Sequence, residues 1–272
     1  MTAIGKLGIV AGAGELPLHI MRACEAAGRP FFVVAVDEFA RTFDASVPHV
    51  RNPISKVGRA LAAMKRNACV DVVFAGKLQR PDGQRAKLRP DFGGLLFLAR
   101  LFGTLERSDD RLHRTIVNMM AKRGMRVVSP LEVVPELTAK AGCLTVTQPA
   151  ATMRAAFGQA LALAKEHGAT KRGQAVVVDG SVVMAREGRE GTDAMLASLS
   201  GGTANGILVK AMAPGQLMTM DPPAIGVETV ENAARAGLKG ILVEAERSVV
   251  VDAARVRARA DELGLFVCAE AA

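Results

Sequence analysis

Apolar and polar positions alternate in blocks along the first half of the chain, and each block predicts one element. Unbroken apolar runs predict buried strands at residues 7–11, 31–36 and 70–76, and in the segment MRVVS. Runs with helical periodicity predict helices at residues 16–28, 54–68, 95–102 and 109–123. Strands without polar alternation, separated by helices, indicate a parallel sheet covered on both faces.

The second half of the chain has a different order of blocks. A long helix is expected at residues 151–168, and AVVVDGSVVMA predicts a β-hairpin with a turn at Asp-Gly. Further strands are expected in GILVK, GILVEA and SVVVD, and further helices at residues 229–238 and 253–264. The predicted fold class is therefore α/β, with two α/β domains. The N-terminal domain is Rossmann-like with a parallel sheet, and the C-terminal domain has a mixed sheet.

The boundary between the domains is expected in a segment with three prolines, from Pro130 to Pro149. This segment has only weak periodicity, as a connection between domains often does. We therefore predict a Rossmann-like domain at residues 1–131, a linker region at residues 132–149 and an α/β catalytic domain at residues 150–272.

The composition narrows the class of partner. The chain has 272 residues and a formal net charge of +8, which favours anionic partners. It has no Trp and no Tyr to stack on bases, so nucleic acid is not an expected partner. A phosphorylated small molecule or a lipid surface agrees better with this charge.

The cysteines and the apolar segments bear on the compartment. Cys24, Cys69, Cys143 and Cys268 are scattered without the spacing of a zinc site, and they favour buried free thiols in a reducing cytoplasm. No segment approaches the roughly 20 uninterrupted apolar residues of a membrane span. The apolar run Leu95–Gly103 follows a basic loop, so it is either part of the core or a contact with an anionic membrane surface.

Two glycine turns follow strands of the predicted parallel sheet. In GAGELP, Gly12 and Gly14 precede a helix, where backbone N–H groups can approach a phosphate. The same turn could be a tight connection without a ligand, or part of a nucleotide-dependent oxidoreductase. In AGKLQRP, Lys77 and Arg80 follow the third strand, at the edge where open α/β sheets bind ligands.

Carboxylates are concentrated in two stretches of the second half. EGREGTDAM contains Glu187, Glu190 and Asp193 near a glycine bend, where these acids could hold Mg²⁺, and there Thr192 or Asp193 could instead cap the next helix. Asp221 precedes two prolines, which make the backbone around it stiff and non-helical. Between these stretches, Lys210 ends a predicted strand.

Seven stretches taken together resemble one family. They are GKLGIVAGAGELP, AGKLQRP, SDDRLHRTIV, GQAVVVDGSVV, EGREGTDAM, GILVKAMAPGQ and DPPAIGVETV. Over nearly its whole length the chain resembles the LpxI-type UDP-2,3-diacylglucosamine pyrophosphatases of lipid A biosynthesis. The pairing of EGTDAM with the downstream Asp-Pro-Pro segment is the specific part of the resemblance.

The resemblance implies an activity and a site. Such enzymes hydrolyse the UDP-linked lipid to UMP and 2,3-diacylglucosamine 1-phosphate, depend on Mg²⁺, and bind the substrate in a cleft between two α/β domains. Asp221 matches the acid that the family treats as essential, and we expect Asp193 and Glu190 to help it hold the metal. We expect Gly12, Gly14, Lys77, Thr192 and Lys210 to contact the substrate. The resemblance further implies a cytoplasmic protein, and it leaves open a homodimer and transient contact with the inner-membrane surface.

The chain departs from the family pattern just before Asp221. Leu217 and Thr219 occupy places where the family commonly has an acid and an arginine. Upstream, Arg186, Gly188 and Arg189 replace residues that are usually apolar. These departures keep a second hypothesis open, in which the chain binds a nucleotide-sugar lipid, or regulates its use, without hydrolysing it.

Overall fold

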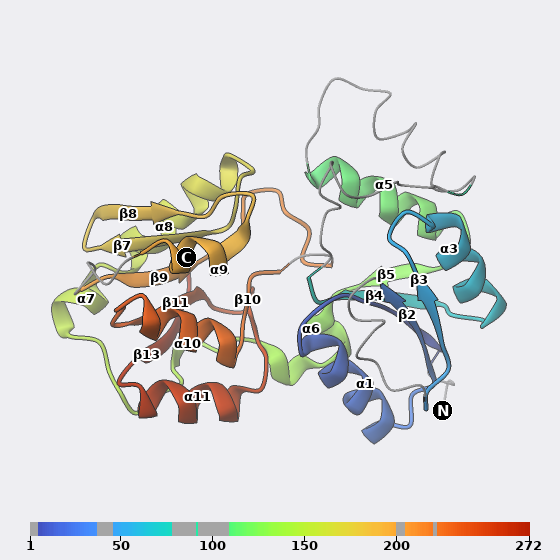
Figure 1. Ribbon diagram of the computed structural model, residues 1–272, viewed down its shortest axis with the longest axis horizontal. Helices are drawn as coiled ribbons and strands as arrows, with labels where there is room; N and C mark the ends of the chain where they lie inside the picture. Colours follow the sequence, from blue (N-terminus) through green and yellow to red (C-terminus); the bar gives the residue numbers. More distant parts are fainter. Residues whose placement is uncertain (1–4, 37–45, 78–90, 92–108, 200–204, 220–221) are drawn as a thin grey trace. The chain divides into compact units, whose positions relative to one another are not determined.

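The chain forms two compact α/β units (Figure 1), seen in a computed structural model. The structure describes residues 5–36, 46–77, 91, 109–199, 205–219 and 222–272, and of residues 109–113 only the backbone. The first unit spans residues 1–135 and 219–221, and the second spans residues 136–218 and 222–272. The predicted helix 95–102, the segment Leu95–Gly103, Arg80 and Asp221 lie outside the described residues.

The first unit is built on a parallel sheet. Its strands are β1 (Leu7–Ala11), β2 (Phe31–Val36), β3 (His49–Asn52), β4 (Asp71–Ala75) and β5 (Arg126–Val128). Its described helices are α1 (Leu16–Ala26), α3 (Val57–Arg66), α5 (Asp109–Ala121) and α6 (Pro130–Val133). The strand order is β3-β2-β1-β4-β5, and all pairs are parallel. The predicted parallel sheet is therefore confirmed.

Helices cover both faces of this sheet (Figure 1). On one face Val34 and Val72 pack with Leu61 and Met64 of α3 and with Met120 of α5. Helices α1 and α6 contact each other beside the opposite face. Strand β3 and helix α6 were missed in the sequence. HVRN is short, polar and at the edge of the sheet, and α6 is a single turn where the connection between the domains was expected.

A network of ion pairs joins three elements at the start of β4. Asp71 contacts Arg29 Nη2 at 2.6 Å and Arg126 Nε at 3.0 Å. Burial of Asp71 favours its neutral form, but the hydrogen bonds from Arg126 and Arg29 outweigh burial and lower the pKa of the carboxyl. The charged Asp71 thus stabilises the junction of α1, β4 and β5.

We predict that this network makes the first unit sensitive to acid. A carboxyl with a lowered pKa contributes stability above the ordinary Asp pKa of about 3.9, and that stability is lost as the pH falls through the lowered value. Asp71→Asn should remove about 2 kcal/mol of unfolding free energy at pH 7 and less at pH 2.5. Urea unfolding followed by circular dichroism measures this, with the exposed Asp179→Asn as control. Equal losses at both pH values would contradict the prediction.

The second unit contains a mixed sheet. Its strands are β6 (Gly142–Cys143), β7 (Ala175–Asp179), β8 (Val182–Arg186), β9 (Ile207–Lys210), β11 (Gly240–Glu244) and β13 (Phe266–Glu270), and β10 (Ala224–Ile225) pairs separately with β12 (Val249–Val250). Its helices are α7 (Ala151–Ala155), α8 (Phe157–Ala169), α9 (Gly191–Ala197), α10 (Val227–Arg235) and α11 (Ala253–Glu262), and a short turn η1 (Pro135–Leu137) precedes them. The strand order of the larger sheet is β6-β13-β11-β9-β7-β8. Its central strands β9, β11 and β13 are parallel, and β6, β7 and β8 are antiparallel to their neighbours, so the predicted mixed sheet is confirmed.

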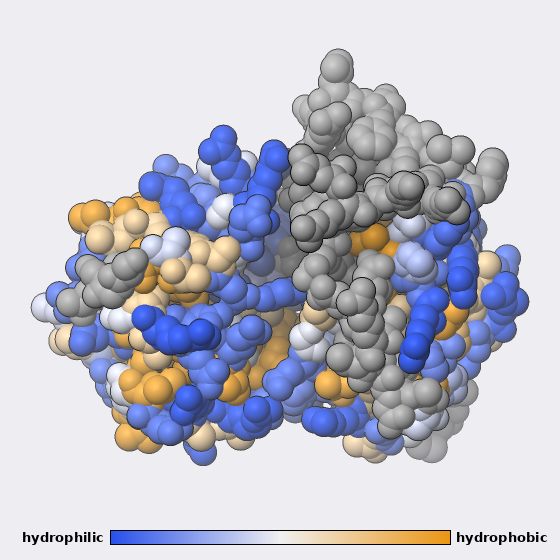
Figure 2. All heavy atoms as spheres, viewed as in Figure 1, coloured by the Kyte–Doolittle hydropathy of each residue, from blue (hydrophilic) through white to orange (hydrophobic). Residues whose placement is uncertain are grey.

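Two helical layers enclose this sheet. Phe157 and Leu161 of α8 pack with Val176 and Val209 on one face. Helices α9, α10 and α11 supply the other layer, in which Leu196, Val230 and Val256 pack against the sheet. Figure 2 shows hydrophilic residues among smaller apolar patches on the visible face of this unit.

The predicted hairpin is present as β7 and β8. Its turn residues are Gly180 and Ser181, between the paired Asp179 and Val182. Gly180 has a φ of +57°, a conformation that favours glycine. A register shift at Val177 and Val178 places a bulge in this edge pair.

Three features of the second unit differ from the predictions. The helix predicted at residues 151–168 is interrupted at Ala156, between α7 and α8. Strand β13 was not predicted, although its apolar run follows a helix and Gly264 as strand signals do. The segment predicted as a linker, residues 132–149, contains η1 and β6, and its residues from 136 onward lie in the second unit.

The cysteine prediction was half right. Cys24 and Cys69 are free and buried, and burial raises the pKa of both thiols. Cys143 and Cys268, expected as free thiols, form a disulfide. They are distant in sequence, but they pair directly across β6 and β13, and spacing in the sequence cannot reveal that pairing.

Within the described ranges, no helix has both the length and the apolar character that crossing a membrane requires.

Candidate functional site

The first unit brings its two glycine turns together at the point where the strand order reverses. From β1 the chain moves outward to β2 and β3, and then returns to place β4 on the other side of β1. Turns that follow β1 and β4 therefore lie side by side at the carboxyl edge of the sheet. Open α/β sheets bind their ligands at such a switch point.

Backbone hydrogen bonds fasten these turns to each other. Ala13 and Lys77 form an antiparallel bridge, with Ala13 N–H donating to Lys77 O at 2.9 Å and Lys77 N–H to Ala13 O at 2.8 Å. Gly12 N–H donates to Ala75 O at 2.8 Å. Gly12, Gly14 and Lys77 are thus placed in one small region by the backbone. The side chain of Lys77 is exposed there.

Gly76 makes this close approach of the turns sterically feasible. Its φ is +82°, and a Cβ at this position would lie 2.5 Å from the carbonyl oxygen of Ala13. Gly14, with a φ of +105°, also needs its conformational freedom, but a Cβ there would meet no atom within 4 Å. Gly76 was not among the residues selected from the sequence, although its place after a buried strand was visible there.

The pair of glycines allows a matched test of the turn. Gly76→Ala combines backbone strain with a clash, so we expect it to lower the unfolding free energy of the first unit by about 3–4 kcal/mol. Gly14→Ala adds strain alone and should cost about 1–2 kcal/mol. Urea unfolding followed by circular dichroism compares them. Equal costs would mean that the contact between Gly76 and Ala13 is not a constraint.

In the second unit, Glu187 organises the acidic stretch. Its carboxylate accepts hydrogen bonds from Thr192 Oγ1 and from the N–H of Gln174, both at 2.7 Å. Its carbonyl oxygen lies 2.8 Å from His167 Nε2. Glu187 is buried, and each carboxylate oxygen has a donor, as a buried charge requires. The hydroxyl of Thr192, a residue in the first turn of α9, therefore positions Glu187.

Gln174 links this stretch to the turn after β9. Its carbonyl oxygen accepts from the N–H of Ala211 at 3.2 Å, and its side-chain oxygen accepts from Gln216 Nε2 at 3.3 Å. Gln216 also caps its own turn by accepting from Ala213 N–H at 2.9 Å. Two stretches selected separately from the sequence, EGREGTDAM and VKAMAPGQ, are thus joined through one residue that was not selected.

Glu190 and Asp193 occupy the first turn of α9. Glu190 is the N-cap residue, with no hydrogen bond from its side chain to the helix, and Asp193 lies three residues further on. Thr192 and Asp193 lie inside the helix, so the alternative that either of them caps it is wrong. One oxygen of Asp193 accepts from Asn232 Nδ2 at 2.8 Å, which ties α9 to α10.

Lys210 and Glu244 end neighbouring strands at the carboxyl edge of the second sheet, and because Lys210 pairs with Val243 the two side chains point to opposite faces. Lys210 is buried at the end of β9 and donates to the carbonyl oxygen of Ala224 at 3.1 Å. Glu244, which sequence reasoning missed, is buried at the end of β11. It contacts Lys165 Nζ at 3.0 Å and accepts from Met212 N–H at 2.9 Å. An acid ending the buried run GILVE was the available signal for it.

The segment after Asp221 is held from two sides. Lys210 bonds to Ala224, and Val249 N–H donates to Pro223 O at 2.8 Å as β10 pairs with β12. Pro222 and Pro223 are buried. Asp221 itself lies outside the described residues, so its assignment remains a prediction. The described chain resumes one residue beyond it, at a fixed position in the second unit.

The described carboxylates do not form a complete metal cage. Within the described part of the chain, no group of three or more His, Cys, Asp or Glu side chains could hold a metal ion. Mg²⁺ often binds through one or two carboxylates together with substrate phosphates and water. Glu190 and Asp193, three residues apart at a helix start, share one side of the turn and are suited to that partial role.

These features define a two-domain α/β protein with two bridged glycine turns at the carboxyl edge of one sheet, and a buried lysine and buried glutamate at the carboxyl edge of the other. Comparison with known proteins agrees with this class. The LpxI N-terminal domain family matches residues 6–137, and the LpxI C-terminal domain family matches residues 140–268. A Caulobacter vibrioides protein named UDP-2,3-diacylglucosamine pyrophosphatase LpxI is 40% identical over 271 residues, covering 96% of each chain. The chain belongs to the LpxI family.

The hydrogen bond between Thr192 and Glu187 can be tested by a matched pair of variants. Thr192→Val leaves one oxygen of a buried carboxylate without its hydroxyl donor, so we expect a loss of about 1–3 kcal/mol of unfolding free energy. Thr192→Ser keeps the donor and should cost less. Urea unfolding of both variants measures the difference. Equal stability would show that this hydrogen bond does not hold the acidic stretch.

Proposed function

We propose that this chain hydrolyses the pyrophosphate bond of UDP-2,3-diacylglucosamine, releasing UMP and 2,3-diacylglucosamine 1-phosphate for lipid A biosynthesis. The observation that carries the proposal is the full-length similarity to the Caulobacter vibrioides pyrophosphatase, 40% identical across both units. Support from the geometry comes from the two carboxyl edges, each of which collects the residue types that pyrophosphate chemistry needs.

The substrate carries negative charge that must be offset at both phosphates. In the first unit, the N–H groups of Gly12 and Lys77 bond to the neighbouring turn, so we propose that Gly12 and Gly14 allow close approach of the substrate and that the exposed ammonium group of Lys77 offsets its charge. In the second unit, Thr192 and Lys210 are the proposed contacts. Lys210 uses one N–H donor on Ala224, which leaves its charge beside the segment that follows Asp221.

Asp221 is the proposed catalytic residue. Its role is to position the attacking water at the phosphorus on the sugar side, on a backbone that two prolines stiffen. We propose Asp221, Asp193 and Glu190 as the residues that hold Mg²⁺, which when bound would offset phosphate charge. Hydrogen bonds from Val249 to Pro223 and from Lys210 to Ala224 hold the segment that follows this acid, which supports the proposal.

The location of the protein follows from the same substrate. A diacylated lipid is held in a membrane, and the enzyme must reach its polar head. We propose a cytoplasmic protein that makes transient contact with the inner-membrane surface. The net charge of +8 favours such contact with anionic lipid.

The decisive assay is incubation of the purified full chain with UDP-2,3-diacylglucosamine, with Mg²⁺ or with a chelator, followed by measurement of UMP. Asp221→Ala should lower the rate at least about 100-fold. Asp179→Ala, which removes an exposed acid of the β7–β8 turn, is the matched control and should keep the rate. Release of UMP by Asp221→Ala at the wild-type rate would refute the assignment of that residue.

The same assay separates hydrolysis from binding alone. Leu217 and Thr219 replace an acid and an arginine of the family pattern, which favours a binding or regulatory protein as the second hypothesis. That hypothesis expects the lipid to bind in a titration while no UMP forms with or without Mg²⁺. Mg²⁺-dependent UMP release by the wild-type chain would exclude it.

A further inference from the structure

The disulfide of the second unit lies at an exposed edge of its sheet. Cys143 is on β6, a two-residue strand at the end of the strand order, and Cys268 is opposite it on β13. Their Cα atoms are 3.9 Å apart. Leu144 N–H donates to Val267 O at 2.8 Å, so the next pair along the ladder is the hydrogen-bonded one. The cysteines therefore form a non-hydrogen-bonded pair, where side chains approach most closely.

The two sulfur atoms differ in access. Cys268 is 2% exposed, whereas Cys143 is only partly buried. Arg154 of α7 donates from Nη2 to Cys143 Sγ at 3.1 Å, and the same nitrogen donates to Gln148 Oε1 at 2.9 Å. A guanidinium group on a cysteine sulfur favours the thiolate once the disulfide is reduced. Cys143 is thus the accessible sulfur, with a cation to stabilise its thiolate.

The segment that carries Cys143 is anchored independently of the disulfide. We call residues 138–148 the strap. At one end, Ala139 N–H donates to Ser248 O and Ala139 O accepts from Glu246 N–H, at 2.9 and 2.8 Å. At the other, the carboxylate of Asp261 accepts from the N–H groups of Val146 and Thr147, at 3.2 and 2.9 Å. Opening the disulfide therefore removes one restraint on the middle of the strap, which Leu144 also ties to β13, and leaves its ends in place.

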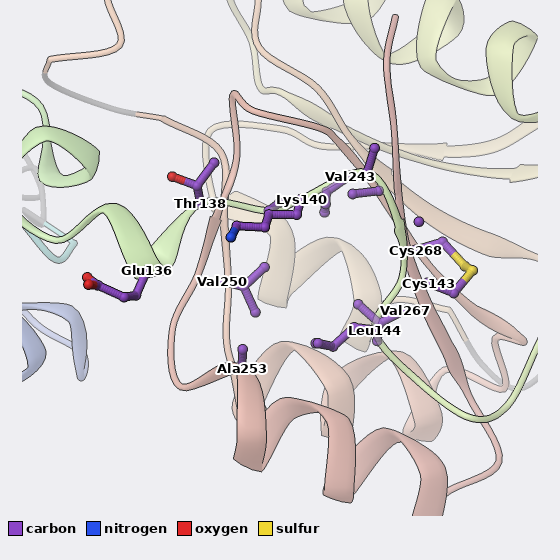
Figure 3. A pocket seen from close by; sticks show the side chains of 14 residues that line it. Glu136, Thr138, Lys140, Cys143, Leu144, Val243, Val250, Ala253, Val267 and Cys268 are labelled. Carbon is purple, nitrogen blue, oxygen red and sulfur yellow. A yellow bond between two sulfur atoms is a disulfide. The ribbon is translucent and has the colours of Figure 1, made fainter.

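An apolar pocket lies beneath the middle of the strap (Figure 3). Its volume is about 280 Å³, and both cysteines line it together with Leu144, Val243, Val250 and Val267. Figure 3 shows the disulfide at one end of the pocket and Glu136 at the other, with Lys140 between them. The charged residues that line the pocket are Glu136 and Lys140, and Glu270 follows the lining residue Ala269 on β13. Arg154 is the charged residue that contacts sulfur.

We propose that Cys143 and Cys268 are a reversible exchange site for low-molecular-weight thiols, and that their disulfide fixes the middle of the strap over the pocket. Cys143 is the exchanging sulfur, and Cys268 is the resolving one. The proposal concerns a modification of the second unit and is independent of the hydrolysis proposed above. It also accounts for a disulfide in a chain whose other cysteines, Cys24 and Cys69, are free.

The exchange balances in two steps. A thiolate attacks Cys143 Sγ, the bond between the cysteines breaks, and Cys268 leaves as a thiolate that takes up a proton. A second thiolate then attacks the mixed disulfide at the sulfur of the small molecule, which forms the small-molecule disulfide and releases the Cys143 thiolate beside Arg154. Two electrons pass from two thiols to the protein. A small-molecule disulfide reverses both steps.

The first test follows the thiols of the folded full chain. Protein is equilibrated with reduced and oxidised glutathione in varied ratio, quenched in acid, alkylated and mapped by mass spectrometry. We expect Cys143 and Cys268 to convert together while circular dichroism stays unchanged, with a mixed disulfide detected on Cys143. Cys24 and Cys69 should stay free and react slowly, as internal controls. Reduction of the pair only under unfolding conditions would overturn the proposal.

The second test separates an active thiol from a merely structural one. In Cys268→Ser, the rate of alkylation of Cys143 by iodoacetamide is measured against pH, with and without Arg154→Gln. Loss of the guanidinium should slow alkylation at pH 7 on the order of tenfold and move the profile to higher pH. Arg257→Gln, an exposed arginine of α11, is the matched control. Identical profiles for all three proteins would refute the role of Arg154.

The third test measures the strap. Amide hydrogen exchange of residues 140–144 should be about tenfold faster in the reduced protein than in the oxidised one, while amides of Val146 and Thr147, bound to Asp261, should change little. Should Cys268→Ser fail to fold, reduced wild-type protein freed of reductant serves in the alkylation and exchange measurements. Equal exchange in both redox states would refute the control of the strap.

Discussion

The parallel packing of buried strands is the constraint on which both candidate sites depend. In each unit the central strands run in one direction and are covered by helices on both faces, so their carboxyl ends converge at one edge. In the first unit this edge receives the turns after β1 and β4. In the second it receives Lys210 and Glu244, the last residues of β9 and β11. Residues far apart in the sequence become neighbours for this reason alone.

Small steric and polar details then determine the shape of each edge. Gly76 allows two turns to bond through their backbones, because any side chain there would overlap the carbonyl of Ala13. Glu187 has the corresponding role in the second unit, where its buried charge is satisfied by Thr192 and Gln174. Both residues act by positioning others. Their importance is visible from contacts and would not be inferred from residue type.

The cysteines show how redox chemistry can depend on topology. Cys143 and Cys268 are 125 residues apart, and their reaction depends on strand pairing at the edge of a sheet. The strap is held at both ends by backbone hydrogen bonds, so a change at its centre can be local. The unit therefore has the candidate site at the carboxyl edge of its sheet and the disulfide at the edge formed by β6.

Local patterns in the sequence determined most of the elements. Mainly apolar runs gave β1, β2, β4, β9 and β11 with nearly the observed bounds, because a strand buried on both faces needs mostly apolar residues. The hairpin with Gly180 in its turn, and the end of α1 just before Gly28, followed from backbone preferences that act over a few residues. The sequence likewise predicted turns after such strands, and these turns contain Gly12, Gly14 and Lys77.

Tertiary structure decided what depends on contacts between distant residues. It supplied the edge strands β3 and β6, the disulfide, the link through Gln174 and the buried Glu244. Their local sequences are short or unremarkable in pattern, and their partners are set by the order of strands in a sheet. Periodicity reports which side of an element is buried. It does not report which element lies against that side, and the candidate sites of this protein depend on which elements pack together.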